Sequence, residues 1–391
     1  MKKIGIIFGT RPEAIKFAPI IREMEMDPRF ELRLISTGQH REMLDQTMGE
    51  FGITPDVDLA VMTPGQTLTG ITHRILERLE VGNHLAGLDG LLVHGDTATT
   101  LAGAIAGAQA QVPVIHVEAG LRSGSLASPF PEEANRKLVG QIAALHLAPT
   151  PSNAANLIRE GIPENTIVVT GNTIVDALRW GTSVKTEYSD PRLQNLASDS
   201  RRVIVATTHR RESHGQPMVE IAHALASLAE RNDIHIVVPL HLNPKVRDVL
   251  GPILRHVPNI SLVEPLPYLE FCQLLQHADI LLSDSSGAEE EGPALGKPTL
   301  VLRDRSERSE SLLTGSSALV GRERTLIHNA VCALLDDPEA YLAMASALNP
   351  YGDGMAARRS VEAIAHFYAL GPATRPFVPG AHEPLLADSV I

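Results

Sequence analysis

The stretch KKIGIIFGTRPEAIKFAPIIREME, residues 2–25, indicates the fold class of this 391-residue chain. A continuous apolar run at residues 4–8 ends at Gly9, and a longer helical pattern begins close to Pro12. Continuous apolar runs that alternate with helices are typical of parallel strands buried on both faces of a sheet. The chain therefore begins with a strand, a tight turn and a helix.

The same alternation recurs in two series. In the first, apolar runs lie at residues 4–8, 32–37, 91–94, 112–117, 145–148 and 167–170. In the second, they lie at residues 203–207, 234–239, 260–263, 280–283, 299–302 and 318–320. A polar segment at residues 181–199 separates the series. We expect an α/β fold of two doubly wound, Rossmann-like domains that face a cleft, with the active site in the cleft.

The domain boundaries follow from these patterns. We expect an N-terminal domain at residues 1–178 and a C-terminal domain at residues 179–354. A last helical pattern, residues 355–370, follows the NPYGDG segment, and we expect it to pack back on the N-terminal domain. The tail, residues 371–391, contains four prolines without periodicity, so we expect it to be loosely ordered.

Composition narrows the class of protein. Hydrophobic residues make up 43% and charged residues 20%, as in ordinary globular proteins. The net charge of −12 argues against binding nucleic acid or anionic membrane, so an anionic substrate needs local cations. The two cysteines, Cys272 and Cys332, lack metal-type spacing. Without an apolar stretch long enough for a signal peptide or a membrane span, we expect a soluble cytoplasmic protein.

Four motifs in the first half place charged residues at strand ends or helix starts. Residues 8–16, FGTRPEAIK, place Arg11 and Lys16 beside a helix start, where both can neutralise a phosphate; the plain alternative is a strand-to-helix turn. HGDT and HVEAGLRSG put Asp96 and Glu118 at the exits of apolar strands. For Asp96 the alternative is a helix N-cap. SPFPEEANRKL puts Glu132, with its neighbour Glu133, in a first helical turn, where acids also favour the helix dipole.

The second half offers groups suited to a nucleotide. TTHRRESHG, residues 207–215, presents His209 and Arg210, and the alternative is a solvated loop. DSSGAEEEGPALGKP, residues 284–298, leads from small residues into a helix. Its serines and glycine can present amides and hydroxyls to a diphosphate, while a later acid can accept from ribose hydroxyls.

Together these motifs identify a family. The chain resembles the non-hydrolysing UDP-N-acetylglucosamine 2-epimerases over nearly all of residues 2–370. The motifs that carry the resemblance, in family order, are GTRPEAIK, TGQHREMLDQ, HGDT, HVEAGLRSG, PEEANRKL, TGNTIVDAL, HRRES, HLNP, LGKPTLVLR and NPYGDG. The resemblance implies the two-domain GT-B-type fold, with UDP held mainly by the second domain, and a homodimer.

The resemblance also implies roles for individual residues. The catalytic group comprises Asp96, Glu118, Glu132 and His209. The residues expected to bind substrate are Arg11, Lys16, Arg210, Phe271, Ser285, Ser286, Gly287 and Glu291. A second UDP-N-acetylglucosamine, an allosteric activator in family members, is expected to contact Gln39, Glu42, Arg74 and His241. Neither a metal nor another cofactor is required.

The chain departs from the family at the second nucleotide motif. The usual DSGGIQEE is DSSGAEEE here, so Ser286 replaces a glycine and Glu289 replaces a glutamine. The usual TERPEA is SERSES at residues 306–311. We expect Glu289 either to point to solvent or to face the ligand and weaken UDP binding by like-charge repulsion.

The expected reaction is the interconversion of UDP-N-acetylglucosamine and UDP-N-acetylmannosamine. The hydrogen at C2 is not acidic, so the family route eliminates UDP to form 2-acetamidoglucal and then adds UDP back. That route needs cations for the leaving diphosphate and carboxylates on both sides of the sugar. The alternatives are a hydrolysing relative that releases N-acetylmannosamine and UDP, a GT-B glycosyltransferase, and a UDP-sugar sensor without turnover.

Overall fold

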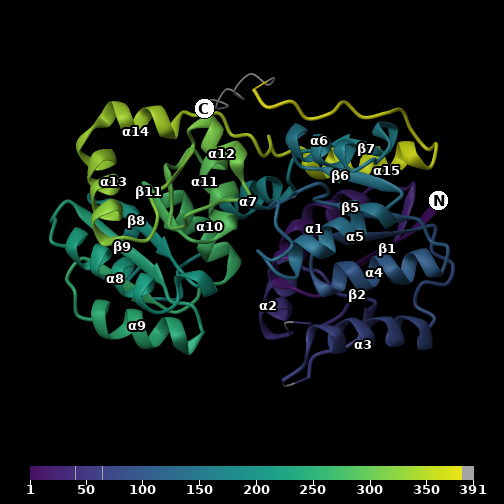
Figure 1. Ribbon diagram of the computed structural model, residues 1–391, viewed down its shortest axis with the longest axis horizontal. Coiled ribbons are helices and arrows are strands. Elements are labelled where there is room, and N and C mark those ends of the chain that lie inside the picture. Colours follow the sequence, from purple (N-terminus) through teal and green to yellow (C-terminus); the bar gives the residue numbers. More distant parts are fainter. Residues whose placement is uncertain (40, 64, 381–391) are drawn as a thin grey trace. The chain divides into compact units, whose positions relative to one another are not determined.

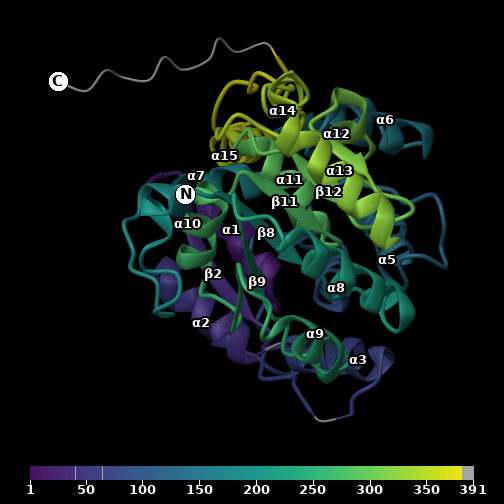
Figure 2. The ribbon, with the colours of Figure 1, turned by 90° about the vertical axis from the view of Figure 1, so that its left-hand side faces the viewer.

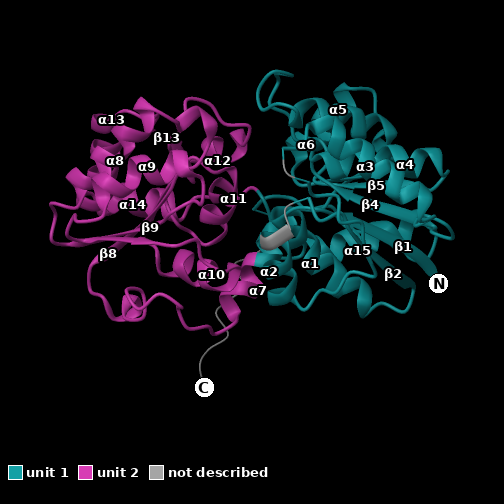
Figure 3. Ribbon diagram, turned by 90° about the horizontal axis from the view of Figure 1, so that it is seen from below, with its two compact units in different colours: residues 1–177, 351–391 teal, residues 178–350 magenta. Residues whose placement is uncertain are grey.

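The computed structural model describes residues 1–39, 41–63 and 65–380, which form two compact units. Unit 1 comprises residues 1–177 and 351–391, and unit 2 comprises residues 178–350 (Figure 3). Unit 1 is therefore built from two separate parts of the chain, whereas unit 2 is continuous. The tail that was predicted to be loosely ordered includes residues 381–391, which lie outside the described residues.

Unit 1 contains a seven-stranded parallel sheet in the order β3-β2-β1-β4-β5-β6-β7 (Figure 1). Its strands are β1 (Lys2–Phe8), β2 (Phe30–Ser36), β3 (Val57–Asp58), β4 (Gly90–His94), β5 (Val114–Val117), β6 (Leu145–Ala148) and β7 (Ile167–Val169). Its helices are α1 (Arg11–Glu25), α2 (Arg41–Phe51), α3 (Leu68–Val81), α4 (Ala98–Gln109), α5 (Glu132–Ile142), α6 (Pro151–Arg159) and α15 (Ala356–Phe367). Helix α7 (Thr173–Ser183) continues into unit 2.

Both faces of this sheet are covered, as its apolar strands require. In β1, Ile4, Ile6 and Phe8 pack with α1, α2 and α15 in one core. The intervening Ile7 belongs to a second core, formed with α3, α4 and α5. Alternate residues of a strand point to opposite faces, so the sequence of β1 specifies both layers at once.

Helix α15 completes unit 1 from the far end of the chain. Its residues Val361 and Ile364 are buried in the core that also contains Phe17 of α1. At its start, the carboxylate of Asp176 accepts hydrogen bonds from the amides of Ala356 (3.2 Å) and Ala357 (2.9 Å). These amides have no partner within the helix, so Asp176 caps it from the neighbouring helix α7.

Unit 2 contains a six-stranded parallel sheet in the order β10-β9-β8-β11-β12-β13. Its strands are β8 (Arg202–Thr207), β9 (Ile234–Pro239), β10 (Ile260–Val263), β11 (Ile280–Ser283), β12 (Thr299–Val301) and β13 (Ser317–Leu319). Its helices are α8 (Gln216–Leu228), α9 (Pro244–Leu254), α10 (Tyr268–His277), α11 (Ser286–Ala294), α12 (Ser309–Thr314), α13 (Arg324–Asp336) and α14 (Pro338–Ala345). Helices α9, α8 and α13 lie side by side, as Figures 1 and 2 both show, over a core centred on β8 and β9.

The predicted α/β fold with two parallel sheets is confirmed. One strand was missed: β3 has only two residues, and its sequence VD carries no apolar run. Within the described ranges, no helix is both long and apolar enough to cross a membrane.

Candidate active site

Each sheet has one point at which the strand order reverses, and ligands of doubly wound sheets bind there, beyond the carboxyl ends of the strands. In unit 1 this point lies between β1 and β4, which are followed by Gly9 and Asp96. In unit 2 it lies between β8 and β11, which are followed by Thr208 and Asp284. Most of the residues predicted to act on substrate follow these four strands or β5.

The turn after β1 is held by a buried carboxylate. Glu13 accepts hydrogen bonds from the amides of Gly9 (2.9 Å) and Thr10 (2.8 Å), and from the hydroxyl of Thr97 (2.6 Å). Burial raises its pKa although these bonds favour the ionised form. A side chain at Gly9 would overlap the hydroxyl of Thr37, whose oxygen lies 2.0 Å from the Cβ position. The turn that leads to Arg11 therefore requires glycine.

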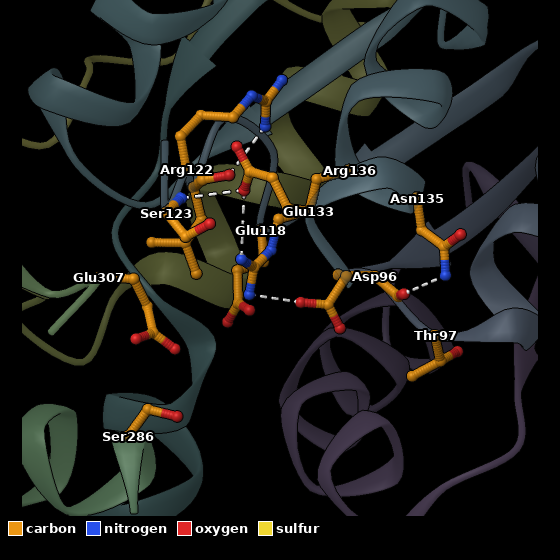
Figure 4. A network of polar contacts seen from close by, with 12 residues as sticks. Asp96, Thr97, Glu118, Arg122, Ser123, Glu133, Asn135, Arg136, Ser286 and Glu307 are labelled. Carbon is orange, nitrogen blue, oxygen red and sulfur yellow. Dashed lines mark hydrogen bonds and ion pairs between the residues drawn. The ribbon is translucent and has the colours of Figure 1, made fainter. Parts of the chain in front are cut away.

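Asp96 is fixed by the first turns of α5. Its Oδ2 lies 2.5 Å from Nη2 of Arg136, and its backbone oxygen accepts a hydrogen bond from Asn135 (2.7 Å). The N-cap of α4 is Thr97, not Asp96, so the capping alternative is wrong. Figure 4 shows Asp96 beside Arg136 and near Glu118. The arginine gives Asp96 a fixed orientation and a countercharge.

Glu118 follows β5 with an unusual backbone. Its φ of +61° is uncommon for a residue with a side chain and costs about 1–3 kcal/mol, so the surrounding structure must hold it. Its Oε2 forms an ion pair with Lys16, accepts a hydrogen bond from Asn172 (3.2 Å), and lies 3.8 Å from Nε2 of His94. Glu118 is buried, with 9% of its surface exposed. Strained residues held in this way are concentrated at functional sites.

The two acids that open α5 differ in their partners. Glu133 is fully buried and accepts a hydrogen bond from the amide of Ser123 (2.9 Å). Glu132 has a buried Oε2 that lacks a hydrogen-bond partner among the residues the structure describes. Oε1 of Glu133 is likewise buried without a hydrogen-bond partner among the described residues, so an unpaired oxygen does not by itself distinguish the two acids.

In unit 2, Asp284 organises the loop after β8. Its carboxylate accepts hydrogen bonds from the hydroxyls of Thr208 (2.8 Å) and Ser213 (2.8 Å), and from the amides of His209 (3.0 Å) and Arg210 (3.0 Å). Asp284 is fully buried. Four donors from one loop fix the backbone that carries the predicted histidine and arginine.

The side chains of this loop meet the start of α11. Arg210 donates to the hydroxyl of Ser286 at 2.6 Å, and Ser285 caps the helix by accepting from the amide of Gly287. The ring of His209 stacks on that of His241, with centroids 5.1 Å apart and an interplanar angle of 15°. Burial lowers the pKa of His209 more than the charge of Asp284 raises it. Cationic and polar groups are thus gathered at a helix N-terminus, as anion binding requires.

The expectation that Glu289 points to solvent is wrong, because the residue is fully buried; the alternative, that it faces the ligand, stays a prediction. Its carboxylate accepts a hydrogen bond from Ser306 and lies 3.8 Å from Nη1 of Arg303. Burial, the largest influence, raises its pKa to about 7. The two departures from the family pattern therefore contact each other: the serine of SERSES donates to the glutamate of DSSGAEEE.

The remaining predicted residues are distributed over both units. Arg11 is partly buried at the first position of α1, Phe271 is partly buried in α10, and Glu291 is buried in α11. Of the expected activator site, Gln39 is buried and accepts from Thr99 (3.0 Å), and Arg74 donates to the backbone oxygen of Val61 (3.0 Å). The side chain of Glu42 lies outside those described. His241 belongs to unit 2, next to His209.

Several residues of the site were missed in the sequence. His94, Asn172 and Arg136 contact the predicted acids, and Asp284 and Glu13 hold the two turns. All five lie inside the quoted motifs, so the motifs themselves were the available signal. Which acid each residue contacts depends on packing between strand ends, which sequence spacing does not report.

Two parallel, doubly wound sheets, each with polar groups at its switch point, place the chain in the class of GT-B-type α/β proteins. The model of the UDP-N-acetylglucosamine 2-epimerase family matches residues 22–365. The chain belongs to this family. It is 48% identical over 369 residues to the UDP-N-acetylglucosamine 2-epimerase of Escherichia coli K12, covering 93% of this chain and 98% of that protein.

Solved structures agree with this assignment. The UDP-GlcNAc 2-epimerase from Neisseria meningitidis, bound to UDP-GlcNAc, has a TM-score of 0.86 and 41% identity, covering 93% of this chain and 100% of that chain. The enzyme from Methanocaldococcus jannaschii, in complex with UDP-GlcNAc and UDP, has a TM-score of 0.80 and 32% identity, covering 93% and 99%. The likeness spans both units.

Proposed function

We propose that this chain interconverts UDP-N-acetylglucosamine and UDP-N-acetylmannosamine without releasing free sugar. The observation that carries the proposal is the set of acids in unit 1: Asp96 and Glu118 beyond the ends of β4 and β5, and Glu132 at the start of α5. Each has a different environment, which suits separate acid and base roles. Family membership supplies the substrate class.

In the proposed reaction, one carboxylate removes the proton from C2 while the bond from C1 to the UDP oxygen breaks. The electron pair of the C2–H bond forms the C1=C2 double bond of 2-acetamidoglucal, and UDP leaves with the electrons of the C1–O bond. UDP then adds back to C1 while a second acid protonates C2 on the opposite face. His209 and Arg210, with the start of α11, supply donors for the diphosphate.

The test is incubation of the purified protein with UDP-N-acetylglucosamine in heavy water, followed by NMR. We expect both UDP-sugars to appear with deuterium at C2, because the proton added on return comes from solvent. An oxygen-18 label in the C1–O bridge should also scramble within the β-phosphate, since UDP departs and returns. Free N-acetylmannosamine and UDP as main products would instead identify a hydrolysing enzyme, and UDP-sugar binding without exchange would identify a sensor.

A further inference from the structure

Lys16 was expected to neutralise phosphate, yet its amine lies against a carboxylate of its own unit. It forms both an ion pair and a hydrogen bond with Oε2 of Glu118, across 102 positions of sequence. Lys16 is 7% exposed and Glu118 is 9% exposed. Removal of one partner of a buried pair costs more than removal of one partner of a surface pair, because the remaining charge is left without compensation in a low dielectric.

The groups around Glu118 come from three separate elements. Lys16 belongs to α1, His94 ends β4, and Asn172 precedes α7. All three approach the same oxygen, Oε2. These contacts fix the orientation of the Glu118 carboxylate. They also help to hold the strained backbone at this position.

The groups that contact the Glu118 carboxylate differ in charge. Burial lowers the pKa of His94 to about 4, so this histidine is neutral at pH 7 and adds no countercharge. Asn172 is neutral, and the nearby carboxylate of Asp96 is paired with Arg136. The amine of Lys16, which contacts Oε2 directly, supplies a positive charge that favours the ionised form of Glu118.

We propose that Lys16 is a positioning residue that keeps Glu118 ionised and oriented for the reaction at C2, and that it is not a ligand of the diphosphate. This proposal rests on the proposed function, in which Glu118 acts on the sugar. It separates Lys16 from Arg11, although both lie in the same motif and both were assigned to the nucleotide. Loss of a positioning residue should lower kcat and leave UDP affinity unchanged, whereas loss of a diphosphate ligand should weaken UDP binding and leave kcat at saturation unchanged.

The experiment compares Lys16→Gln and Lys16→Arg in the full chain. Loss of the amine should lower kcat by ~10²-fold, while the dissociation constant of UDP, measured by calorimetry, should stay within about twofold. The acidic limb of the kcat–pH profile should move to higher pH by about one unit or more, since a carboxylate without its cation protonates more easily. Lys16→Arg should restore the wild-type limb and most of kcat.

A matched control is Lys137→Gln, which removes another lysine–glutamate pair of unit 1, 3.0 Å between Lys137 Nζ and Glu160 Oε1. It should change neither kcat nor the pH profile. A tenfold or greater loss of UDP affinity in Lys16→Gln, with kcat at saturation retained, would overturn the proposal and return Lys16 to the diphosphate.

A double variant covers the case in which Lys16→Gln does not fold. Lys16→Gln with Glu118→Gln removes both buried charges, and its UDP affinity should equal that of Glu118→Gln alone. A tenfold weaker affinity in the double variant would contradict the proposal. Wild-type protein that binds UDP but exchanges no C2 hydrogen would refute the proposed function, and these UDP affinities would still decide whether Lys16 contacts the diphosphate.

Discussion

At the scale of single residues, substitution of the three acids of unit 1 should affect turnover and not nucleotide binding. Asp96→Asn, Glu118→Gln and Glu132→Gln should each lower kcat by ~10²–10⁴-fold, as expected on loss of a positioned acid or base. UDP affinity, measured by calorimetry, should change little. Glu164→Gln, at an exposed position of the same unit, is the control. Weak UDP binding with normal turnover at saturation would show that these acids only hold the ligand.

The buried Glu289 leads to a different prediction, one about stability. Burial raises its pKa from 4.5 to about 7, so ionising it costs stability in the folded protein. Its favourable contribution is therefore complete below about pH 4 and is lost as pH rises through 7. Glu289→Gln cannot ionise, so its melting temperature relative to wild type should increase by about 5 °C or more between pH 5 and pH 8.

Glu187→Gln provides the control for this measurement, because Glu187 is an exposed acid of the same unit. Its melting temperature should follow that of the wild type at both values of pH. If Glu289→Gln also followed the wild type, the carboxylate would titrate as an ordinary acid and burial would not raise its pKa.

At the scale of secondary-structure elements, the cap on α15 should hold the two parts of unit 1 together. Asp176→Ala leaves the amides of Ala356 and Ala357 without their acceptor, which costs about 1–3 kcal/mol for each buried group. We expect a lower melting temperature and faster proteolysis near α15, with Asp176→Asn intermediate because one acceptor remains. Glu80→Ala, exposed on α3, should behave as wild type. Unchanged proteolysis in Asp176→Ala would mean that core packing alone retains the helix.

The elements also show what the sequence could predict. Strands such as β6, β9 and β11 were predicted at their observed bounds, because buried parallel strands are continuous apolar runs between polar turns. The two-residue β3 has no such signal. The motifs placed acids at strand exits, but the contact of Lys16 with Glu118 joins elements distant in sequence and depends on how they pack. The solvent-exposed alternative for Glu289 was wrong because helix position alone does not reveal what covers a side chain.

At the scale of the whole molecule, the two units should differ in their ability to fold alone. Residues 178–350 are continuous and contain a complete core, so this fragment should show a cooperative thermal transition by circular dichroism. Residues 1–177 lack α15, which leaves the side of α1 with Phe17 uncovered. The absence of each large buried side chain, such as Ile364, removes about 1.5–3 kcal/mol of hydrophobic stabilisation. A cooperative transition in the 1–177 fragment would contradict this expectation.

The division of unit 1 between both ends of the chain has a consequence during synthesis. After residue 177 the ribosome must translate another 190 residues, 178 to 367, before α15 can join the sheet that began the protein. At 5–20 residues per second this takes roughly 10–40 s. For that time the nascent N-terminal sheet exposes an apolar face, and unit 2, which ends at residue 350, is complete before α15 has been made. The half of the molecule that carries Asp96 and Glu118 is therefore the part of the newborn chain most in need of a chaperone.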